Sequence, residues 1–330
     1  MAGHPWVAAA DDGVRFGVQL VVRPEVLPRL LEAGRLVDRL GFDGLFIFDH
    51  PSLQADPWMC LSALSAVTER VRLGSIVNCV PYRHPALLAR LGADLDVLSG
   101  GRLVLGLGIG WLASEFRAFD VPMPPIPERH AALAEAMTII TGLWGADAPF
   151  SFSGEHSRVN ELRLLPAPVQ RPRPPIVIGG NGERLTLRQV ARFADACNIN
   201  ELDEKDGGLE GAGLDAVHRR LDALARHCTE VGRPPEEVLR THFTLRLVLA
   251  PTEAAVRTKL DRIEASSAAS ASPATRRARP SATVAGTPEQ VAAHYQARVD
   301  AGIQYFVVQV DAADHETLEL LAAEVMPRVA

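Results

Sequence analysis

The chain has 330 residues, of which 47% are hydrophobic, so it can bury a sizeable core as two ordinary domains or as one large α/β barrel. Its formal net charge of −6 argues against a nucleic-acid-binding surface and against a basic membrane anchor. The four cysteines form no CxxC pair and the ten histidines show no HxH or HExxH spacing, so we expect neither a disulfide framework nor a metal site.

The N-terminal residues MAGHPWVAAADDG lack the basic region and the apolar stretch of a signal peptide. No run of 18 apolar residues occurs anywhere in the chain. We therefore expect a cytoplasmic protein that acts on a small-molecule substrate, without nucleic acid or membrane as a partner. Residues 1–13 are expected to be flexible.

Short apolar runs alternate with longer segments of helical period nearly to the C-terminus, which is typical of repeated βα units on a parallel sheet. Several runs are almost continuously apolar, as strands covered on both faces require. Eight such strands predict a single (β/α)8 TIM barrel over residues 1–330. The predicted strands are Arg15–Leu20, Gly44–Phe48, Val71–Val77, Arg102–Leu107, Pro175–Ile178, Ala196–Asn200, His242–Ala250 and Ile303–Val310.

Two helices have clear ends in the sequence. Residues Leu27–Leu40 carry apolar side chains at helical spacing and stop at Gly41, a residue type that is common just after a helix. Thr287 can cap a second helix, with a proline at the first helical position and Gln290 completing a capping box.

Two segments interrupt the alternation. Residues Pro149–Gln170 surround a Ser-Gly turn with aromatic and branched residues, which predicts a hairpin insertion between the fourth and fifth strands. Residues Ala265–Ala282 contain few bulky apolar side chains, which predicts a mobile loop. The alternative is a lid whose three arginines, at positions 276, 277 and 279, meet an anionic substrate or cofactor tail.

The functional site of such a barrel lies at the carboxyl ends of its strands. The fourth strand ends in three alternate glycines, Gly106, Gly108 and Gly110, followed by Trp111 and then Glu115. Glycines let backbone N–H groups approach a flat or anionic ligand. The pattern is not the dinucleotide-binding fingerprint, because Trp111 occupies the place of the third glycine. A tight turn without a ligand is equally compatible with this run.

Three other strand ends carry polar groups. The second strand ends in Asp49 and His50, which could orient a cofactor and exchange a proton, or could cap a turn and pack. The third offers small and polar side chains over Ser75–Asn78. The fifth is followed by glycines over Gly179–Gly182, just before a helix, where unpaired N–H groups and the helix dipole favour an anion such as phosphate.

Taken together, the motifs resemble a known family. They are GFDGLFIFDH, ERVRLGSIV, DLDVLSGGRLVLGLGIGW and RPPIVIGGNGERLTLRQVARFADACN, in this order. With their spacings they resemble the bacterial luciferase-like flavin and deazaflavin oxidoreductases, most strongly the branch that uses coenzyme F420. The resemblance runs from about Arg15 to the C-terminus. It implies a barrel whose cofactor ring lies at the carboxyl-end mouth.

The resemblance also implies roles for residues. The cofactor would be bound by Asp49, Ser75, Ile76, Asn78, Gly108, Ile109, Gly110, Gly179, Gly180, Asn181 and Gly182. His50 and Glu115 would be catalytic, although a structural pairing of Glu115 within the barrel is the alternative. Trp111 and Gln54 would line the substrate pocket. A non-proline cis peptide is expected between Ser75 and Ile76.

Two departures argue against oxidation of sugar phosphates. Members with that activity have an acidic residue where this chain has Trp111, and a tryptophan where it has Gln54. We therefore expect an F420-dependent oxidoreductase that transfers a hydride between the deazaflavin and a small or medium organic substrate, most often as reduction of an activated C=C or C=N bond. The alternatives are an FMN-dependent monooxygenase and a non-catalytic flavin-binding partner subunit. A homodimer is implied by the resemblance.

Overall fold

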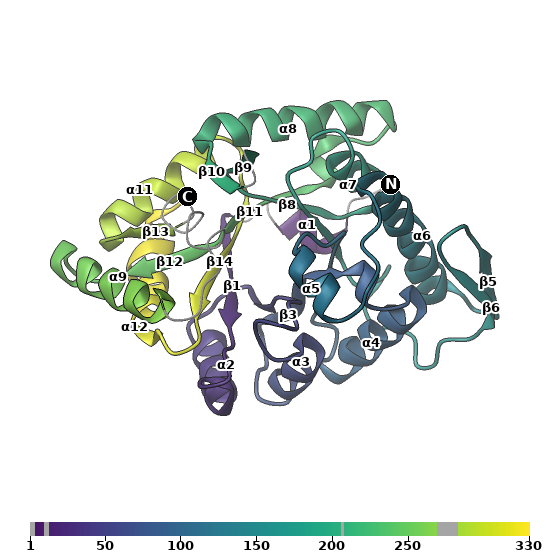
Figure 1. Ribbon diagram of the computed structural model, residues 1–330, viewed down its shortest axis with the longest axis horizontal. Helices are drawn as coiled ribbons and strands as arrows, with labels where there is room; N and C mark the ends of the chain where they lie inside the picture. Colours follow the sequence, from purple (N-terminus) through teal and green to yellow (C-terminus); the bar gives the residue numbers. More distant parts are fainter. Residues whose placement is uncertain (1–3, 10–12, 206–207, 269–282) are drawn as a thin grey trace.

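Eight strands close into a barrel, and helices surround it (Figure 1). The computed structural model describes residues 4–9, 13–205, 208–268 and 283–330. Around the barrel the strands follow the order β1-β14-β11-β8-β7-β4-β3-β2, and neighbouring strands are parallel. The predicted (β/α)8 barrel is therefore confirmed. Its strands are β1 (Arg15–Val21), β2 (Gly44–Ile47), β3 (Arg72–Cys79), β4 (Leu103–Gly108), β7 (Ile176–Gly179), β8 (Ala196–Ile199), β11 (Leu239–Thr244) and β14 (Tyr305–Asp311).

The helices between the strands form the outer layer (Figure 1). They are α2 (Leu30–Arg39), α3 (Pro57–Ser65), α4 (Pro85–Leu98), α5 (Ala113–Ala118), α6 (Ile126–Gly145), α7 (Thr186–Phe193), α8 (Gly213–Glu230), α9 (Glu253–Ala268), α11 (Pro288–Asp300) and α12 (His315–Leu320). Short 3-10 turns cover Leu27–Arg29, Val80–Tyr82, Pro235–Glu237 and Met326–Arg328, and a π-helical turn covers Leu321–Val325. Within the described part of the chain, no helix is long and apolar enough to cross a membrane.

Both helix ends read from the sequence are confirmed. The first predicted helix consists of the turn Leu27–Arg29 and α2, and Gly41 follows it with a φ of +82°, a conformation that glycine adopts at little cost. At the start of α11, Thr287 and Gln290 form the reciprocal hydrogen bonds of a capping box.

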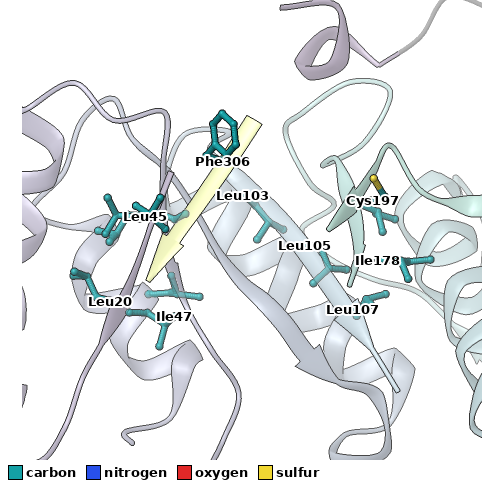
Figure 2. Close-up of a cluster of buried hydrophobic side chains, with 14 of the residues drawn as sticks. Leu20, Leu45, Ile47, Leu103, Leu105, Leu107, Ile178, Cys197 and Phe306 are labelled. Atoms are coloured by element: carbon teal, nitrogen blue, oxygen red, sulfur yellow. The ribbon is translucent and has the colours of Figure 1, made fainter. Parts of the chain in front are cut away.

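The alternation of side chains along each strand builds two cores. Outward-facing side chains such as Leu45 and Ile47 on β2, and Leu105 on β4, pack against the helices, as Figure 2 shows for this outer cluster. Their neighbours in sequence, Phe46 and Val104, belong to a second cluster inside the barrel. Because both faces of each strand are buried, the strands read as continuous apolar runs.

The N-terminal residues close the amino-end of the barrel. Residues Pro5–Ala8 form the short helix α1, and the indole of Trp6 is only 1% exposed and packs edge-to-face on Tyr305 at 5.6 Å. Arg15 donates to the Trp6 carbonyl oxygen at 2.8 Å. For the described residues 4–9 this differs from the flexible segment expected over residues 1–13, because the apolar Trp6 has an internal surface to cover; residues 1–3 and 10–12 lie outside the described residues. The opposite, carboxyl-end mouth is where the site residues gather.

The predicted hairpin insertion is confirmed. Strands β5 (Phe150–Ser153) and β6 (Arg158–Leu162) pair antiparallel, and they lie between β4 and β7 in the chain. A second hairpin, β9 (Leu202–Lys205) with β10 (Gly208–Gly211), follows β8 and was not predicted. Of the segment predicted as a mobile loop or lid, residues 269–282 lie outside the described residues.

The seventh predicted strand, His242–Ala250, is wrong in its boundaries. The barrel strand β11 begins at Leu239 and ends at Thr244. The following β12 (Arg246–Leu249) leaves the barrel and pairs in parallel with β13 (Thr283–Gly286). The sequence HFTLRLVLA does not reveal such a change of partner, because both strands contribute buried apolar residues to it.

A charged cluster ties β8 to α11. Arg298 on α11 donates to both carboxylate oxygens of Glu201 at 2.6 and 2.7 Å, and His242 lies 3.2 Å from the same carboxylate. Burial raises the pKa of Glu201, but the nearby His242 and the hydrogen bonds from Arg298 outweigh it and lower the pKa to about 2. Glu201 is therefore ionised at neutral pH.

Candidate active site

The central feature at the barrel mouth is a pair formed by His50 and Glu115. His50 follows β2, and Glu115 lies on α5, the helix after the glycine turn of β4. The imidazole Nδ1 is 2.7 Å from the Glu115 carboxylate, which is 1% exposed, whereas the His50 side chain is partly open. The two residues that were expected to be catalytic therefore act as one unit.

Hydrogen bonds hold the Glu115 carboxylate in its charged form. It accepts from the Ser52 backbone N–H at 3.0 Å, from the Ser52 hydroxyl at 2.6 Å and from the Tyr82 hydroxyl at 3.2 Å. Burial raises the pKa of Glu115, but the hydrogen bonds from His50 and Ser52 more than offset it, and the pKa falls to about 2. An ionised carboxylate can only accept, so Nδ1 of His50 carries the donated proton and Nε2 remains for a ligand.

Asp49 lies beside this pair and is held by an arginine. Its Oδ2 accepts from Arg83 at 2.6 Å and from the Cys79 backbone N–H at 3.1 Å. Arg83 also bonds Asp56, the N-cap of α3, at 2.8 Å. Burial raises the pKa of Asp49 from its ordinary value, and the Arg83 guanidinium opposes this. The other oxygen, Oδ1, is buried without a hydrogen-bond partner.

The end of β3 is irregular. Ser75 pairs with Leu105 of β4 and Asn78 pairs with Leu107, so β3 contains one residue more than its partner over this stretch. The non-proline cis peptide lies inside this bulge, between Ile76 and Val77. The expectation of a cis bond between Ser75 and Ile76 is therefore wrong by one residue, because the motif alone does not reveal where the extra residue is accommodated.

Among the described residues, three buried polar atoms at this mouth have no hydrogen-bond partner: Oδ1 of Asp49, Oγ of Ser75 and Oδ1 of Asn78. The Asn78 amide nitrogen, in contrast, donates to the Gly106 carbonyl at 2.9 Å. A buried acceptor left unpaired is costly, so this set fits a bound group that donates hydrogen bonds. The ring N–H and sugar-alcohol hydroxyls that flavins and deazaflavins share are such donors.

The two glycine turns differ in how they are built. After β4, a Cβ on Gly108 would lie 2.6 Å from a Val77 methyl, and Gly110 has a φ of +75°. Arg129 donates to the carbonyls of Ile109 and Gly110, which fixes the turn with its carbonyls occupied. The turn therefore needs glycine for packing and backbone conformation, whether or not a ligand is bound.

In the second glycine turn, Gly179–Gly182, both the amide nitrogen and the amide oxygen of Asn181 form hydrogen bonds within the protein. Its amide donates to Asn200 Oδ1 at 2.7 Å and to the Leu202 carbonyl at 2.9 Å, and it accepts from the Asn200 N–H at 3.0 Å. The N–H of Gly180 is bonded to the Asn198 carbonyl. Within Gly179–Gly182, Asn181 thus joins the loops after β7 and β8, and its expected contact with the cofactor finds no free amide group.

The two expected pocket residues lie in different surroundings. Gln54 is buried, and its amide bonds the Phe48 carbonyl at 2.6 Å and the Val22 N–H at 3.1 Å, so it anchors the loop rather than presenting a polar group to a substrate. Trp111 is 65% exposed, and its ring meets His50 edge-on at 5.7 Å.

Sequence reasoning missed four residues that shape the site: Gln19, Ser52, Tyr82 and Arg83. Gln19 is buried inside an apolar strand, donates to the Ile76 carbonyl and accepts from Gln309 at 3.0 Å. A glutamine within an apolar run is a signal that could have been used. Ser52 and Arg83 give no such signal, because their partners are distant in sequence.

The geometry can be compared with known proteins. The family model of the luciferase-like monooxygenases matches residues 13–305. The chain belongs to this family. It is 31% identical over 240 residues, 68% of its length, to the F420-dependent glucose-6-phosphate dehydrogenase of Microbacterium testaceum. It is also 31% identical over 216 residues to the F420-dependent hydroxymycolic acid dehydrogenase of Mycobacterium tuberculosis, covering 63% of this chain.

The family also contains relatives named for FMN. One is the FMNH(2)-dependent dimethylsulfone monooxygenase of Pseudomonas putida, 32% identical over 190 residues and 57% of this chain. The matches cover 66%, 58% and 50% of the three relatives' own lengths, less than two thirds in each case. Among solved structures, the coenzyme F420-dependent tetrahydromethanopterin reductase of Methanopyrus kandleri matches 96% of this chain and 100% of its own, with a TM-score of 0.79 and 19% identity. That likeness shows the shared barrel fold.

Proposed function

We propose that this luciferase-like chain, taken as one domain over residues 1–330, is a coenzyme F420-dependent oxidoreductase. It would move a hydride between the deazaflavin and a small or medium organic substrate, as reduction of an activated C=C or C=N bond. The observation that carries the proposal is His50, held by the ionised Glu115 beside three buried polar atoms that lack partners. The names of two relatives support the choice of cofactor.

The residues at the barrel mouth would have separate roles in binding and in proton transfer. Asp49, Ser75 and Asn78 would hold the donor groups of the cofactor, with the two glycine turns as walls. When bound, the cofactor supplies the hydride. His50 would bind the substrate through Nε2 and deliver a proton to the atom next to the one that receives the hydride, so that H⁻ and H⁺ together saturate the double bond. Glu115 keeps Nδ1 protonated and stabilises the charged imidazole.

Cofactor binding tests this proposal directly. Purified protein is titrated with coenzyme F420 and, separately, with FMN, and binding is followed by the absorbance or fluorescence of each cofactor. Micromolar binding of F420 is the expected result. Micromolar binding of FMN alone would overturn the choice and favour the monooxygenase alternative, which the FMN-dependent relative supports.

The third possibility is a non-catalytic flavin-binding subunit. The intact His50–Glu115 pair speaks against it, because a binding subunit has no use for an imidazole of fixed tautomer. Absence of any cofactor-dependent turnover over a broad panel of enones and imines, despite cofactor binding, would favour that class.

A homodimer in the cytoplasm completes the proposal. Four apolar side chains are exposed on the neighbouring helices α3 and α4, namely Met59, Leu87, Val97 and Leu98. Exposed apolar patches of this kind often mark protein–protein contacts. Light scattering at micromolar concentration should give the mass of a dimer, and Leu87→Glu should shift it towards the monomer. A monomeric unmodified protein would contradict this part.

A further inference from the structure

We infer that the substrate of this site is an uncharged, planar, apolar molecule that packs against Trp111. The inference rests on the proposed function for the reaction and narrows its substrate class. It is carried by the surroundings of His50, by the exposure of one tryptophan and by the state of the charges at the mouth.

The reactive imidazole is flanked by aromatic rings. Phe48 meets His50 edge-on at 5.5 Å and an interplanar angle of 64°, and Trp111 does so at 5.7 Å and 75°. Both contacts are edge-to-face, and among the described residues no hydrogen bond engages Nε2, which Glu115 leaves for a ligand. A molecule bound at Nε2 therefore lies next to the indole. Aromatic faces bind flat, conjugated groups well, since dispersion and quadrupole contacts are both satisfied.

Trp111 differs from the other tryptophans of the chain. Its side chain is 65% exposed, whereas Trp6, Trp58 and Trp144 are 1%, 6% and 6% exposed. Two further exposed apolar side chains belong to the segments that hold the His50–Glu115 pair: Leu53 in the turn after His50, and Phe119 at the end of α5. An apolar surface beside a polar group is typical of a substrate pocket rather than of a solvated loop.

Among the described residues, which leave out 269–282, the arginines at the strand ends nearest His50 already have partners. Arginines near the ends of β1, β3 and β4 are already engaged: Arg23 with Asp311, Arg83 with Asp49 and Asp56, and Arg129 with the carbonyls of Ile109 and Gly110. Arg184 is exposed, but it follows the second glycine turn, where the cofactor phosphate is expected. An anionic substrate at Nε2 of His50 would meet an imidazole whose charge is already balanced by the ionised Glu115 at Nδ1.

Trp111 can be observed in binding without any turnover. Because the other three tryptophans are buried, quenching of intrinsic fluorescence by succinimide should report mainly on Trp111. We compare three probes, each of which carries a phenyl group. The compound 4-phenylbut-3-en-2-one is neutral and planar, cinnamate is planar but anionic, and 4-phenylbutan-2-one is neutral but has a saturated chain. We expect the neutral enone to reduce the quenching at least about twofold, with little effect of cinnamate. Trp111→Phe should remove the quenchable component and serves as the control.

Turnover separates the inference from the proposed function. With reduced F420, kcat/KM for the neutral enone should exceed that for cinnamate by at least about tenfold. Trp111→Ala should raise KM for the enone about tenfold with kcat nearly unchanged, and Trp111→Phe should restore most of the loss. Protection of Trp111 without turnover would defeat the proposed reaction but keep the substrate class. Equal or better use of cinnamate, or turnover of the enone without protection, would overturn the inference.

Discussion

The carboxylate of Glu115 lies 2.7 Å from Nδ1 of His50, although 65 positions separate the two residues in the chain. Strand β2 carries one partner to the mouth and the helix after β4 carries the other. The pair thus depends on closure of the barrel, and it has the form of an imidazole oriented by a buried acid.

His50→Ala should lower kcat for the preferred enone by about 100-fold, because the variant loses the group that donates the proton. The dissociation constant for F420 should change less than about threefold, since Asp49, Ser75 and Asn78 remain. Steady-state kinetics and a cofactor titration of the same preparation check both values. A variant with nearly unchanged turnover would remove His50 from the chemistry.

Glu115→Gln should lower kcat by roughly tenfold to 100-fold while F420 still binds, because a neutral amide no longer stabilises a protonated imidazole. The loss should fall on kcat rather than on the dissociation constant for F420, a split that a purely structural role would not produce. Steady-state kinetics and a cofactor titration of both proteins provide the test, with Ser52→Ala as a milder matched variant. An unchanged kcat would leave Glu115 as a structural residue only.

Removal of Arg83 should destabilise the protein. Arg83→Met leaves the Asp49 carboxylate buried without its ion partner, at a cost of about 3 kcal/mol in the free energy of unfolding. The double variant with Asp49→Asn should recover part of this cost, because no charge is then buried unpaired. Urea unfolding of the single and double variants measures the coupling. Additive losses in this cycle would mean that the ion pair is not coupled.

The Glu201–Arg298 pair should make stability depend on pH in the acid range. The pKa of Glu201 is about 2 in the folded protein and near 4.5 without its partners, so the unfolded chain binds the proton more tightly. The stabilisation of the folded protein by the ionised Glu201 carboxylate is fully present above pH 4.5 and is lost as the pH falls towards 2. The difference in unfolding free energy between the unmodified protein and Glu201→Gln should shrink over this interval. A difference that stays constant from pH 6 to pH 3 would contradict the lowered pKa.

Trp6→Ala should cost about 3 kcal/mol or more of stability, since it removes a fully buried indole from the amino-end of the barrel. Trp111→Ala removes the same side chain from an exposed position and should change stability by less than about 0.5 kcal/mol. Thermal unfolding of the two variants side by side gives the comparison. Similar melting temperatures would mean that α1 does not seal the barrel.

The sequence allowed the barrel to be predicted because strands buried on both faces, such as β2 and β4, leave continuous apolar runs. It also placed Asp49 and His50 at the mouth, because they directly follow such a run. The local sequence pattern could not reveal where a strand changes its pairing register or its partner strand. The bulge at Ile76 and the break after Thr244 are set by pairing with other strands.

Side-chain roles were harder to predict than positions. Gln54 and Asn181 were expected to contact the substrate and the cofactor, but backbone groups and the Asn200 side chain satisfy their amides. Whether a polar side chain is free depends on loops that are distant in sequence. Conversely, Arg83 orients Asp49 from the end of the next strand, and no local motif marks it.

The helix α1 covers the amino-end of the packed barrel interior with the buried side chain of Trp6, which leaves the carboxyl-end mouth as the place where ligands enter. Cofactor and substrate would then share one opening, and a cofactor held, as proposed, by the atoms buried at the ends of β2 and β3 would occupy the deeper place. We therefore expect an ordered kinetic scheme, in which the cofactor enters first and leaves last and the organic product departs before the cofactor exchanges.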